Sequence, residues 1–88
     1  MRLNSRHKDQ THDPLVQCLV RHGWRMFSVH HVSRFVDAIG VKTGRVLFFE
    51  FKTGTAKPKP HQIDLHEQLR AAGAEVVVIS SVEQVKAL

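Results

Sequence analysis

The sequence predicts an α/β fold in which a mixed sheet of about four strands is flanked by helices. Two stretches carry apolar residues at helical spacing. Three short stretches rich in valine and phenylalanine lie between them, and a fourth apolar stretch follows the second helix at once. With a last short helix, the expected element order is α-β-β-β-α-β-α.

The first helix is expected between Pro14 and Gly23. Leu15 and Leu19 are four residues apart, which places them on one helical face. A glycine suits the position just after a helix. Residues 1–10 are polar and charged and are interpreted as an arm or as a frayed lead-in to the first helix, within a single domain that spans the chain.

Three strands are expected next, over residues 24–32, 34–41 and 45–52. Valine, isoleucine and phenylalanine, which favour strands, recur in all three stretches. Residues 42–44 have turn chemistry and end in a glycine, so we expect the second and third strands to be antiparallel neighbours.

The second half of the chain predicts a loop, a helix, a strand and a final helix. The loop covers residues 53–59, and the helix starts at Pro60 and ends near Gly73. Residues 75–79 are largely apolar, as in a buried parallel strand. The third strand, this helix and the fourth strand then form a right-handed crossover, so the sheet is mixed. The serine-to-glutamate spacing of residues 80–83 predicts a capping box for the last helix.

Composition narrows the classes of function. The chain has 88 residues, one cysteine, and 13 Lys and Arg against 8 Asp and Glu, a net charge of +5. A single thiol suits a reducing compartment, and the positive excess favours polyanions such as nucleic acid. No apolar run approaches the roughly 20 residues that span a bilayer. We expect a cytoplasmic protein with no membrane association, and a homodimer that enlarges its small core.

Charged residues interrupt the two strands joined by the 42–44 turn. Because side chains alternate along a strand, Glu50 and Lys52 share one face while Phe49 points to the other. Asp37 lies in the neighbouring apolar stretch. An ionised carboxylate in such surroundings is costly unless it is paired or bound to metal. The pattern therefore indicates a site.

These residue types suit phosphodiester hydrolysis. Mg²⁺ takes oxygen ligands and keeps several waters, so Asp37, Glu50 and the backbone carbonyl of Phe51 suffice as protein ligands. Lys52 would position the attacking water or neutralise charge at phosphorus. The simpler alternative is a solvated ion pair between Glu50 and Lys52 on an exposed sheet face.

In order and spacing, these motifs resemble the PD-(D/E)xK nuclease superfamily, and more narrowly its small phage-type, VRR-NUC-like members. The resemblance runs from about residue 12 to residue 85 and implies a restriction-endonuclease-like αβββαβ core. Asp37 and Glu50 match the metal-binding acids of the family, and Lys52 matches its catalytic lysine. Gln62 matches a glutamine that lies near the active site at the start of the second helix.

Two departures from the family pattern concern the backbone and the ligands. The usual proline before the motif aspartate is Val36, and the usual upstream glycines are replaced by Ser33 and Phe35. The family often has a metal-binding glutamate in the first helix, whereas this chain has no glutamate before Glu50. Asp13, or else Asp9, would have to serve as that ligand, although Asp13 also suits the N-cap of the first helix.

Basic residues on strand ends and loops flank the predicted site and are candidates for phosphate contacts on either side of the cut. They are Arg34, Lys42, Arg45, Lys57 and Lys59. A solvated rim with no role in binding is the alternative. His30, at the end of the first strand, is a candidate for contact with the scissile phosphate or else an ordinary surface residue.

The resemblance implies a divalent-metal-dependent DNA endonuclease, bacterial or phage-encoded, that acts on flap or junction DNA with Mg²⁺ or Mn²⁺. The main alternative is a catalytically degenerate DNA-binding module on the same scaffold, which the missing first-helix glutamate favours. A structural interaction protein without a nucleic-acid partner is a third possibility.

Overall fold

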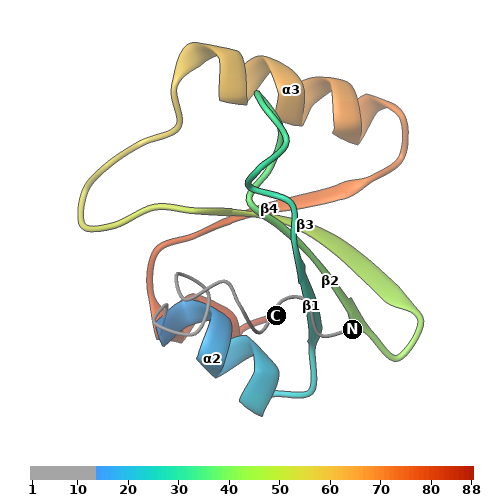
Figure 1. Cartoon of the computed structure of the whole chain (residues 1–88), viewed down its shortest axis with the longest axis vertical. Coiled ribbons are helices and arrows are strands. Elements are labelled where there is room, and N and C mark those ends of the chain that lie inside the picture. Colours follow the sequence, from blue (N-terminus) through green and yellow to red (C-terminus); the bar gives the residue numbers. More distant parts are fainter. Residues whose placement is uncertain (1–13) are drawn as a thin grey trace.

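The computed structural model describes residues 14–88, and the helices and strands in this range follow the predicted order (Figure 1). Their bounds are α2 (Pro14–Arg21), β1 (Arg25–Ser28), β2 (Ala38–Lys42), β3 (Arg45–Phe51), α3 (Pro60–Ala71), β4 (Glu75–Ile79) and α4 (Val82–Lys86). The predicted arm, residues 1–10, lies outside the described residues. Within residues 14–88, each helix is too short or too polar to span a lipid bilayer.

The strands form one sheet in the order β1-β2-β3-β4. β2 is antiparallel to both β1 and β3, whereas β3 and β4 are parallel and are joined through α3. The turn between β2 and β3 has positive φ at Thr43 (50°) and Gly44 (81°), as a type I′ hairpin turn requires. The predicted α/β class with a mixed four-stranded sheet is confirmed.

Helices cover both faces of the sheet, with α3 on one side and α2 and α4 on the other (Figure 1). The side of α2 and α4 holds the main apolar core, where Leu19, Trp24 and Phe49 are at most 3% exposed. Trp24 and Phe49 pack edge to face with ring centroids 5.8 Å apart. The side chains that alternate with this core along β3 therefore point toward α3.

Close packing on the core side requires glycine at position 40 of β2. A Cβ at this position would lie 2.6 Å from the Phe49 ring and 2.8 Å from the Met26 sulfur. The ring of Phe49 can thus pack against the β2 backbone, in a register that pairs Ala38 with Phe49. Continued by one residue, this register brings Asp37 next to Glu50.

The loop between β1 and β2 is longer than predicted. Strands were expected over residues 24–32 and 34–41, but residues 29–37 lie outside both strands. Arg34 has a φ of 58°, whereas an extended strand needs a negative φ, so a strand cannot continue through this residue. The valines of this stretch imitate a strand, and it contains neither glycine nor proline.

The start of α4 differs from the prediction by one residue. Ser81, not Ser80, is the N-cap: its Oγ accepts from the Gln84 N–H at 3.4 Å. In return, Gln84 Oε1 accepts from the Ser81 N–H at 3.1 Å. Gln84 rather than Glu83 therefore completes the capping box.

Candidate active site

Glu50 is buried on the sheet face that α3 covers. Its exposed fraction is 2%. The alternation that sends Phe49 into the apolar core sends Glu50 to the opposite face. A buried carboxylate is costly without partners, so the groups that contact Glu50 define the site.

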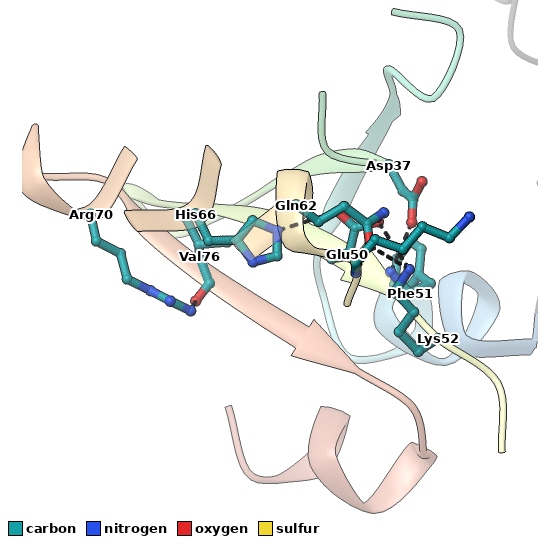
Figure 2. A network of polar contacts seen from close by, with 9 residues as sticks. Asp37, Glu50, Phe51, Lys52, Gln62, His66, Arg70 and Val76 are labelled. Carbon is teal, nitrogen blue, oxygen red and sulfur yellow. Dashed lines mark hydrogen bonds and ion pairs between the residues drawn. The ribbon is translucent and has the colours of Figure 1, made fainter. Parts of the chain in front are cut away.

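Gln62 links this carboxylate to Lys52. The Gln62 Nε2 donates to Glu50 Oε2 at 3.0 Å, and its Oε1 accepts from Lys52 Nζ at 2.8 Å. The same Oε1 accepts from the backbone N–H of Lys59 at 2.7 Å, just before the first turn of α3. One amide side chain therefore caps the helix and joins the two charged groups (Figure 2).

Lys52 follows β3 directly and remains attached to the sheet. Its backbone N–H donates to the carbonyl of Ile79 at 3.0 Å. Its Nζ lies 3.9 Å from Glu50 Oε2, and its side chain is 14% exposed whereas that of Glu50 is 2% exposed. The ammonium is thus the more accessible partner of the pair.

Asp37, the residue just before β2, supplies a second carboxylate beside β3. Its Oδ2 accepts from the Phe51 N–H at 2.8 Å, and its own N–H donates to the Phe49 carbonyl at 3.0 Å. The N–H and C=O of one strand residue point to the same neighbouring strand, so the Phe51 carbonyl is directed toward the Asp37 side. The structure therefore gathers Asp37, Glu50 and this carbonyl at one end of β2 and β3 (Figure 2).

Burial and like charge raise the pKa of Glu50 to about 7. Desolvation is the largest cause, and the Asp37 carboxylate adds to it through repulsion and a hydrogen bond. The Lys52 ammonium acts in the opposite direction but does not outweigh them. Two carboxylates held this close favour a bound cation, which would stabilise the charged form of both.

His66 belongs to the site, although the sequence analysis does not single it out. Its Nε2 lies 3.3 Å from Glu50 Oε1, and the residue is 3% exposed. Burial, then the charges of Arg70 and Lys52, lower the pKa of His66, which favours the neutral imidazole. The available signal was the spacing from Gln62, because residues four apart share a helical face.

The donor set fits a hard divalent cation. Carboxylate and carbonyl oxygens suit Mg²⁺ and Mn²⁺, and Mg²⁺ needs only one or two carboxylates because it keeps several waters. Within residues 14–88 no group of three or more His, Cys, Asp and Glu side chains could hold a metal. The candidate ligands are two side chains, the carboxylates of Asp37 and Glu50, together with the Phe51 carbonyl. Asp13, the further predicted ligand, lies outside the described residues.

Four of the predicted DNA-contacting residues lie in loops that lead into the site. Lys57 and Lys59 precede α3, whereas His30 and Arg34 belong to the loop that ends at Asp37. All four are exposed. Their contact with DNA stays a prediction, and their positions are compatible with it.

Lys42 and Arg45 do not flank the site. They lie at the hairpin end of β2 and β3, and Arg45 is five positions before Glu50 along β3, about 16 Å at about 3.3 Å per residue. Both cationic groups lie 5.9 Å from the centroid of the Trp24 ring. Arg45 also pairs with Glu75 at 3.1 Å. These two residues were expected to flank the site because they lie at strand ends, but the length of β3 places them far from the acids.

No protein-family model and no curated protein matches this chain. Among solved structures it is similar to one described as "VRR_NUC domain", with a TM-score of 0.68 and 29% sequence identity. The match covers 85% of this chain and 89% of that one. This likeness confirms the resemblance to VRR-NUC proteins, which belong to the PD-(D/E)xK superfamily. Because both chains are covered almost entirely, the likeness concerns the architecture as a whole.

Proposed function

We propose that this VRR-NUC-like chain is a divalent-metal-dependent endonuclease that hydrolyses phosphodiester bonds in DNA. The observation that carries the proposal is the meeting of two carboxylates and an ammonium, from Asp37, Glu50 and Lys52, at one end of the sheet. A solvated ion pair does not fit, because Glu50 is 2% exposed and its pKa is raised. The similarity to a VRR_NUC domain independently supports a nuclease-type role in DNA processing.

Asp37, Glu50 and the Phe51 carbonyl would hold the cation. A bound Mg²⁺ or Mn²⁺ supplies Lewis acidity, which polarises a phosphate oxygen and makes a water molecule more acidic. The contribution of the protein is orientation. The hydrogen bond of 2.8 Å from the Phe51 N–H fixes the Asp37 carboxylate against the strand that carries Glu50.

Lys52 supplies the positive charge that the substrate needs. A phosphodiester is an anion and gains negative charge at its oxygens during attack, so a nearby ammonium stabilises the transition state or orients the attacking water. Gln62 accepts a hydrogen bond from this ammonium at 2.8 Å and so keeps it beside Glu50. Gln62 is therefore a positioning residue for both groups.

We further propose that the substrate is branched DNA, such as a flap or a junction. The net charge of +5 and the exposed loop residues Arg34, Lys57 and Lys59 support binding of a polyanion. Two copies acting as a homodimer would present two sites to one branched substrate. Exposed apolar side chains such as Phe27 (51%) and Ile63 (47%) offer contact surface. Size-exclusion chromatography with light scattering tests the dimer.

A cleavage assay tests the proposed activity on linear, flap and four-way-junction DNA, each with Mg²⁺, Mn²⁺ or a chelator. We expect cutting only with metal and preferentially on branched DNA. Asp37→Asn and Glu50→Gln should abolish it while the far-ultraviolet circular dichroism is unchanged. Asp64→Asn and Glu67→Gln, which change exposed carboxylates on α3, are matched controls that should cut normally. Cutting in chelator, or by either site variant, would contradict the proposal.

The second candidate is a DNA-binding module without catalysis, favoured by the absence of a glutamate before Glu50. Mn²⁺ titration separates the two candidates. A metal that binds only the folded state stabilises it by about 2.7 kcal/mol at 100 times its Kd. The endonuclease should show this stabilisation in a thermal melt, whereas the degenerate module should bind DNA but melt at the same temperature with and without Mn²⁺.

A further inference from the structure

One buried polar side chain has no part in the chemistry proposed above. Within residues 14–88, the buried polar or charged residues are Glu50, 2% exposed, and His66, 3% exposed. His66 lies on α3 one turn after Gln62, and both side chains reach toward Glu50 from that helix (Figure 2). The helix thus brings two nitrogen groups to one carboxylate.

The two oxygens of Glu50 have different partners. Oε1 lies 3.3 Å from His66 Nε2. Oε2 accepts from Gln62 Nε2 at 3.0 Å and lies 3.9 Å from Lys52 Nζ. Oε2 is therefore the oxygen on the side of the ammonium, and Oε1 is turned toward the interior of the α3 layer.

We propose that His66 is a positioning residue that holds Oε1 of Glu50, so that Oε2 is the oxygen presented to the divalent cation. This inference rests on the proposed function, because it assumes that Glu50 is a metal ligand. It assigns His66 a role through Glu50, with no contact to the substrate.

The geometry explains why such a residue is needed. The last torsion of a glutamate side chain is broad and nearly two-fold, so a carboxylate without a fixed donor exchanges its two oxygens freely. An ionised carboxylate can only accept a hydrogen bond, so His66 must carry its proton on Nε2. A donor from His66 then holds Oε1, while Oε2 accepts one hydrogen bond from Gln62 and keeps a second lone pair for the cation. Partners of this kind typically contribute a factor of about 10 to 100 in metal affinity.

The competing explanation is that His66 only fills space between α3 and the sheet. The two explanations differ in what a substitution must preserve. His66→Gln can place an amide Nε2 near the position of the imidazole Nε2, and so keeps a donor. His66→Leu keeps apolar volume and removes the donor. His22→Leu is the matched control for loss of a histidine, because His22 is exposed in the turn after α2, and α2 covers the opposite face of the sheet.

Isothermal titration of each folded protein with Mn²⁺ is the first test, with circular dichroism and a metal-free melt as checks of folding. We expect His66→Leu to weaken Mn²⁺ binding by about 10- to 100-fold, and His66→Gln to stay within about threefold of wild type. His22→Leu should bind as wild type does. Equal affinity of His66→Leu and wild type, or an equal loss in both His66 variants, would overturn the inference.

Nuclear magnetic resonance of the unmodified protein is the second test, and it does not depend on the folding of a variant. With Mg²⁺ bound and Glu50 ionised, imidazole ¹⁵N spectra should show the Nε2–H form of His66. The Nδ1–H form, or loss of the Nε2–H signal on Mg²⁺ binding, would contradict the inference. A protein that binds Mg²⁺ with this signature but cuts no DNA would refute the endonuclease and leave the role of His66 standing.

Discussion

The two ends of β3 each carry an acid–base pair, and the pairs differ in burial. At the hairpin end, Arg45 and Glu75 approach to 3.1 Å with side chains 45% and 54% exposed. At the other end, Lys52 and Glu50 are 3.9 Å apart with side chains 14% and 2% exposed. The exposed pair therefore has the shorter contact, while the buried pair has less water to stabilise its charges.

The pKa values of the two glutamates, Glu75 and Glu50, shift in opposite directions. A mutual hydrogen bond is the main cause that raises the pKa of Arg45 and lowers that of Glu75, as in an ordinary ion pair. The pKa of Glu50 is instead raised to about 7, because burial and Asp37 outweigh the pull of Lys52. The short distance between Arg45 and Glu75 is typical of a structural ion pair. The burial of Glu50 beside a second carboxylate is instead typical of a functional site.

The largest expected difference between the two ends is in catalysis. Lys52→Met removes the ammonium while keeping most of the side-chain volume, and should lower the cleavage rate by about 10² to 10³-fold. Arg45→Met removes a cation of the exposed pair and should stay within about twofold of wild type. Single-turnover cleavage of junction DNA measures both. A comparable loss in Arg45→Met would erase the contrast between the two ends.

The next difference is in the dependence of stability on pH. The folded-state pKa of Glu50, about 7, exceeds its ordinary value of 4.5, so the folded protein retains a proton that the unfolded chain releases between these values. The stability that Glu50 contributes is therefore present at low pH and lost as pH rises toward 7 and beyond. Without metal at about pH 8, Glu50→Gln should be more stable than wild type by about 3 kcal/mol, with little difference near about pH 4.

Glu75 should show the reverse slope. Its pKa is lowered, so its contribution is present above the unfolded value and lost as pH falls through the folded value. Glu75→Gln should therefore be less stable than wild type at neutral pH, and the difference should vanish in acid. Urea unfolding of Glu50→Gln, Glu75→Gln and wild type, from acid to about pH 8, measures how the free energy of unfolding depends on pH in each case. Slopes of the same sign would show that burial does not separate the pairs.

Alternation along β3 made much of the site predictable from the sequence. Because strand side chains alternate, placing Phe49 in the core fixes Glu50 on the other face. The short turn after β2 then made Asp37 a cross-strand neighbour. Both expectations rest on local geometry, and the observed register agrees with them.

The parts that could not be predicted depend on contacts distant in the sequence. Leu65 and Leu69 have the apolar spacing of a buried helical face, yet both are only half-buried and His66 is the buried residue of α3. Its burial follows from the carboxylate of Glu50 beneath the helix, which helical periodicity does not encode. The loop before Asp37 could not be predicted for a different reason. Its positive φ occurs at Arg34, and only a glycine at that position would have indicated it in the sequence.

The smallest expected difference concerns DNA binding, and it tests which basic residues reach phosphates. In a Glu50→Gln background that cannot cut, Lys57→Ala with Lys59→Ala should reduce the slope of log K against log salt by about 2, since each phosphate contact contributes about 0.9. The backbone N–H of Lys59, which donates to Gln62, is unaffected by that change.

The matched double variant at the hairpin end is Lys42→Ala with Arg45→Ala. We expect its salt slope to stay close to that of the parent, because Glu75 already neutralises Arg45 and the pair lies about 16 Å along the strand from Glu50. Fluorescence anisotropy at several salt concentrations measures both slopes. A larger reduction of the salt slope in the hairpin variant than in the Lys57→Ala, Lys59→Ala variant would contradict this expectation. The DNA would then contact the hairpin near Trp24, and the loops before α3 and Asp37 would be solvated and make no contact with phosphates. The hairpin end of β3, with Arg45 and Glu75, would then bind the same DNA as the site around Glu50.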